Sequence, residues 1–467
     1  MTPEGEVDST DGLLVHYTHS EFASRWAYKY KDLFRYVEDD DQYRHFNGRY
    51  WKKVGPDAPT HFIEKYNVAL LDQIKGELPL NEGDPSIYII ANSNETKDVE
   101  RAEKWSIAQC RAMCNAGNIA SILRLARTKR PIAVAGKRFD QDPDLLNMPN
   151  GTYDRRTREK REHSAADMIT HTTRACYDPT ATGPTFDRFF DRVQTEKRQQ
   201  LILSALRYSI RGTGGEVAFI HVGSGGNGKS TLFDAVEYAL GTYAHTADAR
   251  ILTQAGEDDH PTALAELEGM RVSVIKLGSK RVGADQLRAI VAENSFNAHK
   301  MHKDSRTIQA THTFHVLQNE APPPNQLDPS AKRRYVVIDW DVILPDSERD
   351  GSLGESLKLE ADYILTKILD APELDLTTLD RSETEKYLGR NTVYAWFAKY
   401  MELDPTARIP AAELYDHYKE LYGDEAVGQK SFGQQLSQYG VGRANENYRK
   451  DDGKNAFHTV RTGYKFK

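Results

Sequence analysis

The stretch VAFIHVGSGGNGKSTLFDAVEYALG, residues 217–241, decides the fold of this chain. Its first six residues form an apolar run of strand length, and residues 231–240 place apolar side chains at helical spacing up to a stop at Gly241. Between them lies GSGGNGKS, the GxxxxGK[ST] pattern of a phosphate-binding P-loop. Strand, loop and helix follow in the order that a P-loop requires, so the sequence predicts a nucleoside triphosphate site.

Each residue type of this loop has a chemical role in binding a triphosphate. Glycines let consecutive backbone N–H groups turn inward around phosphate oxygens. The lysine adds charge near the outer phosphates, and the serine hydroxyl can ligate Mg²⁺. A glycine-rich turn that matches by accident is disfavoured by the flanking strand and helix. The expected cofactors are ATP and Mg²⁺, with Ser230 as the metal ligand, and the predicted ATP-binding residues are Gly223, Gly225, Gly226, Asn227, Gly228, Lys229, Ser230 and Thr231.

Size and composition limit what the rest of the chain does. A chain of 467 residues can hold two to four domains, and a formal net charge of -7 argues against binding nucleic acid over the whole surface. Residues 428–467 differ, with eight Lys and Arg against three Asp and Glu, which predicts a local anion-binding module.

The three cysteines are typical of a reducing compartment. Cys110 and Cys114 are interpreted as buried small residues, because no second Cys or His pair completes a zinc site. No apolar stretch approaches a membrane-spanning length. We therefore expect a cytoplasmic protein, in the host cytoplasm if the chain is viral, with no membrane partner.

Further strand-like runs follow the P-loop helix at residues 270–277, 313–318 and 335–340. Strands that alternate with helices predict a mainly parallel sheet covered on both faces, with the P-loop at its carboxyl edge. Upstream, residues 20–126 have a mostly helical pattern. The acidic loop Glu38–Asp41 within them is interpreted as a solvated turn, with a metal site as the alternative.

Residues 139–177 are rich in turn signals and predict an irregular or β-containing connector. Its basic cluster, residues 155–161, is either a solvated hairpin or a phosphate contact. At the C-terminus, helices are predicted at 393–401, 410–421 and 430–439, the last with Phe432 and Leu436 inward, before a hairpin with a turn at residues 451–454. This order suits a winged helix-turn-helix, and a small protein-interaction domain is the alternative.

Together these pieces resemble the superfamily 3 helicases of phage and plasmid primase-helicases, a group related to poxvirus primase-helicases. The resemblance rests on the P-loop and on motifs around it. These are residues 139–151, Tyr177-Asp178-Pro179 with Phe186 and Phe189, residues 263–271, Asn319, and Asp328 with Arg333-Arg334.

The resemblance implies an α/β fold: a P-loop, AAA+-like parallel-sheet ATPase domain, a mostly helical N-terminal region and a C-terminal winged-helix domain. The expected domains are residues 1–135 (helical), 136–190 (connector or collar), 191–345 (ATPase), 346–384 (lid or linker) and 385–467 (winged helix).

Roles follow for individual residues. An Asn at a strand end beside the P-loop can sense the γ-phosphate, and an arginine finger can reach a neighbouring subunit's nucleotide. A run at 299–306 occupies the place of the family's DNA-tracking hairpin, although alone it would be an exposed loop. The predicted catalytic residues are Lys229, Asn319, Arg333 and Arg334, and the predicted DNA-binding residues are Lys300, His302, Lys303 and Arg306.

One position departs from the family pattern. Where the family has an acidic residue at the end of the second strand, this chain has Leu277, which cannot orient the shell of Mg²⁺ or polarise water. Glu293 or Asp285 are the candidates to supply the missing charge.

Two functions therefore compete. The first is an ATP-driven, ring-shaped DNA helicase of phage or plasmid replication, a homo-oligomer and by the resemblance a hexamer, acting on single-stranded or forked DNA with a separate primase. The second is an ATP-binding replication initiation or assembly factor that hydrolyses poorly. A small-molecule kinase would share the P-loop, but it leaves the basic C-terminal module unexplained.

Overall fold

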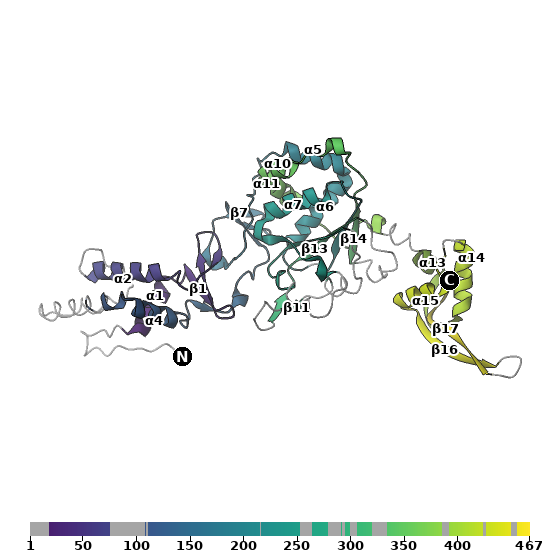
Figure 1. Ribbon diagram of the computed structural model, residues 1–467, viewed down its shortest axis with the longest axis horizontal. Helices are drawn as coiled ribbons and strands as arrows, with labels where there is room; N and C mark the ends of the chain where they lie inside the picture. Colours follow the sequence, from purple (N-terminus) through teal and green to yellow (C-terminus); the bar gives the residue numbers. More distant parts are fainter. Residues whose placement is uncertain are drawn as a thin grey trace. The chain divides into compact units, whose positions relative to one another are not determined.

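The chain forms two compact units in the computed structural model (Figure 1). The first unit comprises residues 1–142 and 160–171, and the second comprises residues 143–159 and 172–467. The residues that the structure describes are 18–74, 108, 111–214, 216–252, 264–278, 291, 295–298, 306–319, 334–384, 392–423, 426–449 and 455–467.

Within the described residues, three α-helices and a small sheet build the first unit. The helices are α1 (His19–Lys29), α2 (Thr60–Ile74) and α4 (Ala116–Ala126). Thr18 and Glu21 form a capping box that fixes the start of α1, and Phe22 and Trp26 of this helix are fully buried. The sheet has the order β3-β2-β1-β4, from strands β1 (Phe34–Val37), β2 (Gln42–Phe46), β3 (Trp51–Val54) and β4 (Ala133–Val134). The sequence predicted the helical character of this region and missed the four strands.

The acidic loop, residues 38–41, is the turn between β1 and β2. The prediction of a turn is confirmed, but the turn is not fully solvated. Asp40 is buried, with its carboxylate 3.1 Å from the Lys53 ammonium and 3.6 Å from the Arg44 guanidinium. The prediction of a buried cysteine was wrong for Cys114, which is exposed, while Cys110 lies outside the described residues.

A five-stranded parallel sheet with the order β14-β8-β13-β10-β9 forms the centre of the second unit. This confirms the predicted parallel sheet. Its strands are almost wholly buried because helices and loops cover both faces. The strands are β8 (Ala218–Val222), β9 (Ala244–Thr246), β10 (Val272–Gly278), β13 (Thr313–Gln318) and β14 (Tyr335–Asp339).

Five helices share the core on one face of this sheet, and Figure 1 shows them together on that side. They are α5 (Pro184–Val193), α6 (Glu196–Ser209), α7 (Lys229–Leu240), α10 (Leu353–Leu359) and α11 (Ala361–Asp370). Leu357 and Ile364, from the segment predicted as a lid or linker, are fully buried in the core that contains α7. A second core on the opposite face includes Ile251, Leu267 and Leu277.

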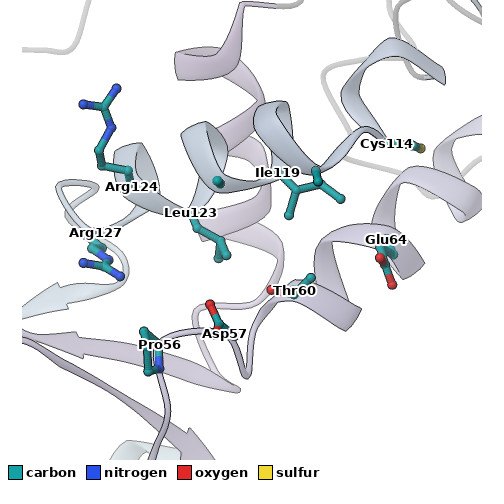
Figure 2. A pocket seen from close by; sticks show the side chains of 11 residues that line it. Pro56, Asp57, Thr60, Glu64, Cys114, Ile119, Leu123, Arg124 and Arg127 are labelled. Carbon is teal, nitrogen blue, oxygen red and sulfur yellow. The ribbon is translucent and has the colours of Figure 1, made fainter.

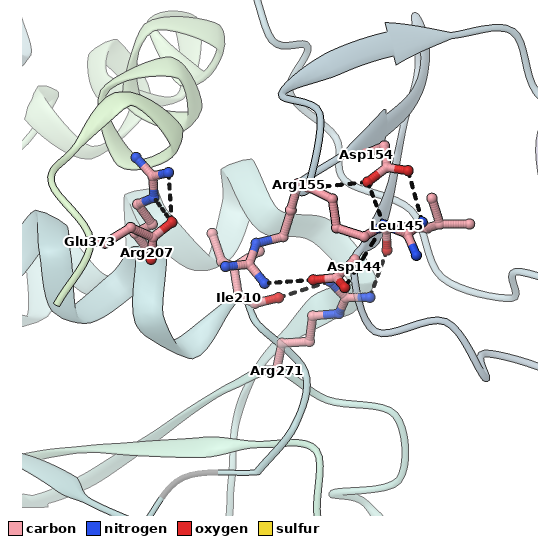
Figure 3. Close-up of polar contacts among 9 residues, drawn as sticks. Asp144, Leu145, Asp154, Arg155, Arg207, Ile210, Arg271 and Glu373 are labelled. Atoms are coloured by element: carbon pink, nitrogen blue, oxygen red, sulfur yellow. Dashed lines mark hydrogen bonds and ion pairs between the residues drawn. The ribbon is translucent and has the colours of Figure 1, made fainter. Parts of the chain in front are cut away.

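Part of the predicted connector belongs to this second unit. Strands β5 (Leu145–Met148) and β6 (Gly151–Asp154) form an antiparallel hairpin. The buried Arg271, just before β10, donates hydrogen bonds to the carbonyl oxygens of Leu145 (2.7 Å) and Ile210 (2.8 Å), as Figure 3 shows. This arginine therefore ties the hairpin and the end of α6 to the sheet. The short strand β7 (Glu159–Arg161) follows where the chain passes between the two units.

Two strands, β11 (Ser295–Ala298) and β12 (Arg306–Gln309), pair antiparallel between β10 and β13 in the sequence. The described 3₁₀ helices are η2 (Gly136–Arg138), η3 (Ala165–Asp167), η4 (Gly241–Tyr243), η5 (Ala249–Ile251) and η8 (Asp346–Glu348). Among the described helices, none combines the length and the apolar character that crossing a bilayer requires.

The C-terminal part has its own core around Trp396, Tyr418 and Phe432. Its helices α13 (Thr392–Tyr400), α14 (Ala411–Tyr422) and α15 (Gln429–Gln438) confirm the three predicted helices to within one residue at each end, and Phe432 and Leu436 are buried as predicted. The predicted turn at 451–454 lies outside the described residues. The sequence missed β15 (Met401–Pro410), which completes a sheet of order β15-β17-β16 with β16 (Gly442–Arg449) and β17 (Asn455–Phe466).

Candidate nucleotide site

The glycine-rich loop joins β8 to α7 at the carboxyl edge of the parallel sheet. Gly226 and Gly228 have φ angles of 80° and 83°, in the left-handed region that glycine adopts without strain. A Cβ at Gly228 would also stand 2.8 Å from the ring of Phe189. The loop therefore needs glycine for its backbone and for its packing, and its glycine cradle fits a bound phosphate.

Lys229 is folded over this loop. Its ammonium donates to the carbonyl oxygen of Gly223 (2.5 Å) and to Oδ1 of Asn227 (2.9 Å), and its side chain is buried. These partners are neutral oxygens, and burial lowers the pKa of Lys229 to about 8. A phosphate would supply the full negative charge that this buried ammonium lacks among its present partners.

Asn227 attaches the loop to the segment that follows β14. Its Nδ2 donates to the carbonyl oxygen of Trp340 (3.2 Å), at the residue that follows β14, and its side chain is buried. Ser230 lies on the first turn of α7 and is exposed, so its hydroxyl is accessible to the predicted metal ion. Thr231 follows it and is half-buried.

Asn319 lies beside the loop. It is the first residue after β13, the strand that lies next to β8 in the sheet. The amide of Gly223 donates to the carbonyl oxygen of Gln318 (3.2 Å), so the start of the P-loop and the end of β13 are in direct contact. The side chain of Asn319 is exposed, and its position is one from which an amide can reach a γ-phosphate.

Beyond β13, the end of β10 places Leu277 and Lys276 on opposite sides of the strand. Val272 and Val274 of β10 pack in the core that contains α7, whereas Leu277 is buried in the core on the opposite face. The β10 side chain that reaches α7 near this edge is Lys276, whose ammonium forms an ion pair with Asp234 of α7. On the side that faces α7, the end of β10 therefore carries a lysine, and Leu277 lies on the other side.

Arg334 lies at the other edge of the sheet. It directly precedes β14, and its carbonyl oxygen accepts from the amide of Ala218 at the start of β8 (2.7 Å). The five residues of β8 separate this point from the P-loop, a distance of about 17 Å along a strand. The structure does not bring Arg334 to the P-loop of its own chain.

Of the remaining predicted site residues, the backbone of Arg306 alone lies within the described part of the chain. Arg306 begins β12, and its side chain is not among the described ones. The predicted residues that lie outside the described part of the chain are Lys300, His302, Lys303, Arg333, Asp285, Glu293 and Asp328.

A chain of buried polar groups under the P-loop was missed from the sequence. The Trp340 indole donates to Nδ1 of His221 (3.2 Å), Nε2 of His221 is 3.2 Å from Nδ1 of His315, and Nε2 of His315 is 3.0 Å from the Ser209 hydroxyl, which donates to the carbonyl oxygen of Ala205. Because the indole can only donate, each histidine accepts at Nδ1 and donates at Nε2, so both are neutral. Burial lowers the pKa of both histidines, that of His315 to about 3. The only sequence signal was a histidine inside each of two apolar strands.

The first unit contains a cleft of about 470 Å³ between α2 and α4 (Figure 2). Its apolar floor includes Ile119 and Leu123, and Glu64 and Arg124 lie on its rim. The P-loop belongs to the second unit, and all the residues that line this cleft belong to the first.

Two protein-family models match the chain. The model described as D5 N terminal like matches residues 23–195, and a family of unknown function (DUF5906) matches residues 221–334. These domains are typical of viral and phage primase-helicases. In these two regions the chain is therefore similar to viral and phage primase-helicases. The second match runs from the end of the P-loop strand to Arg334, so it contains the loop, α7, β10 and β13.

The chain is also similar to single proteins. "Putative helicase L207/L206" of Acanthamoeba polyphaga mimivirus is 24% identical over 212 residues, which make up 43% of this chain and only 22% of the relative's length. Among solved structures, the apo structure of NrS-1 C terminal region (305-718) has 12% identity and a TM-score of 0.47, with 98% of this chain and 100% of that chain covered. The A form apo structure of the same region has 12% identity and a TM-score of 0.44, with coverages of 92% and 96%.

Proposed function

We propose that this chain is an ATP-driven, ring-forming DNA helicase that moves along single-stranded DNA during phage or plasmid replication. In this proposal ATP and Mg²⁺ bind at the P-loop, where Lys229 and the loop amides hold the phosphates and Ser230 ligates the metal ion. Asn319 senses the γ-phosphate and orients the attacking water.

The proposal rests on one observation: the predicted nucleotide-binding residues and the predicted arginine finger lie at opposite edges of one sheet. The P-loop and Asn319 share the carboxyl edge, whereas Arg334 precedes β14 at the amino edge. An arginine about 17 Å along the strands from its own P-loop serves as a finger only for a nucleotide bound to another copy. A ring of copies, a hexamer by the family resemblance, supplies such a neighbour to every site.

The C-terminal part supports a DNA-binding role. Its order of helix, strand, two helices and two strands, with the sheet β15-β17-β16, fits a winged helix-turn-helix. Arg461 of β17 fixes α15 through hydrogen bonds to the carbonyl oxygen of Gly433 (2.6 Å) and the hydroxyl of Ser437 (2.7 Å). Lys430 on α15 and Arg443 on β16 are exposed, where they can contact phosphates.

Phosphate release and strand displacement on a forked DNA test the proposal together. The purified chain should hydrolyse ATP, DNA should stimulate that hydrolysis, and the fork should be opened only when ATP is present. Lys229→Ala sets the background, because it removes the charge at the outer phosphates. Turnover no higher than this variant's, with or without DNA, refutes the motor.

The end of β10 favours a second candidate, an ATP-dependent assembly factor that hydrolyses slowly. Among the described residues, the edge of β10 presents Lys276, Leu277 and Gly278 and no carboxylate to polarise water. Particle mass separates the two candidates when it is measured with ATP and single-stranded DNA beside phosphate release. ATP-dependent assembly and DNA retention with negligible phosphate release would select the assembly factor.

A further inference from the structure

The segment after β14 lies against the P-loop. The amide of Leu344 donates to the carbonyl oxygen of Gly226 (3.0 Å), and the carbonyl oxygen of Trp340 accepts from Asn227. Two hydrogen bonds thus attach residues 340–344 to two positions of the loop. The chain then turns through η8 and carries Arg349 back towards the same place.

Arg349 contacts the loop at Gly226. A Cβ built on Gly226 would lie 2.6 Å from Nη2 of Arg349 and 3.3 Å from its Cζ. The guanidinium therefore fills the space that any side chain at position 226 would need. Gly226 is exposed at the surface of the loop, and the Arg349 side chain is 54% exposed, so an anion in the loop can reach it.

Two ion pairs position this arginine. Nη1 of Arg349 lies 2.7 Å from Oδ1 of Asp346, while Nη2 is the nitrogen next to the loop. The neighbouring Glu348 accepts two hydrogen bonds from Arg192 of α5, at 2.8 and 3.1 Å, which fix η8 to the helical face of the sheet. A guanidinium presents five N–H donors in a planar fork that matches phosphate oxygens, and Asp346 is an exposed carboxylate that phosphate can replace.

We propose that Arg349 is a phosphate-binding residue for the nucleotide in the P-loop of the same chain. The inference rests on the proposed nucleotide site and adds a residue to it. Asp346 holds the guanidinium beside Gly226, and the phosphates of ATP can take the place of Asp346 as its partner. Arg349 acts on its own chain, whereas Arg334 at the opposite edge can serve only a neighbour.

Equilibrium binding of ATP, ADP and adenosine to the full chain tests the assignment. Arg349→Ala should weaken ATP binding about tenfold, the range expected for loss of a charge-assisted hydrogen bond, and should leave adenosine binding unchanged. Arg349→Lys should recover part of the loss, because it keeps the charge and loses the fork. Asp346→Asn should tighten ATP binding, since a competitor for the guanidinium is weakened.

Arg156→Ala is the matched control. Arg156 is 53% exposed and pairs with Asp154 at 2.7 Å, much as Arg349 pairs with Asp346, but it lies on the connector hairpin. This variant should bind ATP as the unmodified chain does. The assignment is overturned if Arg349→Ala binds ATP within twofold of the unmodified chain, or if it loses ATP and adenosine binding equally. An unmodified chain that binds no ATP overturns the nucleotide site itself and this inference with it, so the two failures are distinct.

Discussion

Two neighbouring strands of the parallel sheet, β13 and β10, end in different chemistry at the edge that carries the P-loop. Strand β13 ends in Asn319, a polar side chain beside the first glycine of the loop. Strand β10 ends with Lys276 paired to Asp234, Leu277 buried on the far face, and Gly278. The residues proposed to hold and sense a triphosphate thus lie beside one strand end, while the end of the other strand, residues 276–278, has no carboxylate to activate water. In the proposed site, holding ATP and cleaving it are therefore separable properties.

The largest effect is expected from Arg334→Ala. This variant should bind ATP normally and lose about a thousandfold in turnover, the scale of an arginine finger. Because the finger acts on a neighbour in this proposal, Arg334→Ala mixed with Lys229→Ala should regain turnover, since the intact P-loop of the first variant can receive the intact finger of the second. Steady-state phosphate release over a mixing series measures this. No recovery in the mixture, or normal turnover in Arg334→Ala alone, would remove the need for a neighbouring copy.

A carboxylate placed at the end of β10 tests the difference between the two strands. Lys276→Glu puts a carboxylate on the side of the strand that faces α7. Turnover should rise about tenfold if hydrolysis is slow because a carboxylate that acts as general base or orients the water shell of Mg²⁺ is missing. Leu277→Glu is its control, since it buries the same acid in an apolar core. That variant should lower the melting temperature without raising turnover, because an unpaired buried carboxylate is costly. Unchanged turnover in Lys276→Glu would mean that another acid already serves.

The buried histidines under the P-loop should make the second unit sensitive to acid. Burial lowers the pKa of His315 to about 3 and also that of His312, which directly precedes β13 at the opposite edge of the sheet, to about 4, while an unfolded histidine titrates near 6.5. The unfolded chain therefore binds more protons between these values, so stability should fall as the pH drops below about 6.5. His315→Asn should flatten the dependence of the melting temperature on pH. His245→Asn is the comparison, because His245 is only half-buried, and it should change the slope less; equal slopes in both variants would contradict the burial argument.

The smallest expected effect is proton uptake by Lys229. Its pKa is lowered to about 8 by burial, so above that pH the folded chain carries part of this lysine as the neutral amine. Phosphate favours the ammonium, so ATP binding should take up a fraction of a proton near pH 9, and less near pH 7. Calorimetric titrations in two buffers of different ionisation enthalpy measure the number of protons taken up per ATP bound. The same proton count at both values would show that no phosphate approaches Lys229.

Sequence reasoning was most accurate where the signal is local. The P-loop, the strands around it and the three C-terminal helices follow from apolar spacing and turn residues within short windows. Strand β15 has no continuous strand pattern, because Asp404 and Pro405 lie within it, and its register shifts between Leu403 and Arg408. The strands of the first unit have two to five residues, too few for a clear alternating pattern.

Long-range contacts in the site left no such signal. Alignment by residue order placed Leu277 at the position of the family acid, and only the two faces of β10 show that Lys276 is the side chain that reaches α7. Arg349 approaches Gly226 from a segment more than a hundred residues further along the chain, in a region predicted as a lid or linker. His221 and His315 are polar residues in apolar strands whose partners come from different elements.

The most direct measurement is an equilibrium titration of the unmodified chain with Mg²⁺ and ATP, with Lys229→Ala as the reference. The glycine cradle and its buried lysine predict saturable binding of one ATP per chain in the unmodified protein and a large loss of affinity in the variant, whatever the rate of hydrolysis. Binding that is absent from the unmodified chain, or that is equally strong in Lys229→Ala, would contradict a triphosphate site at this loop.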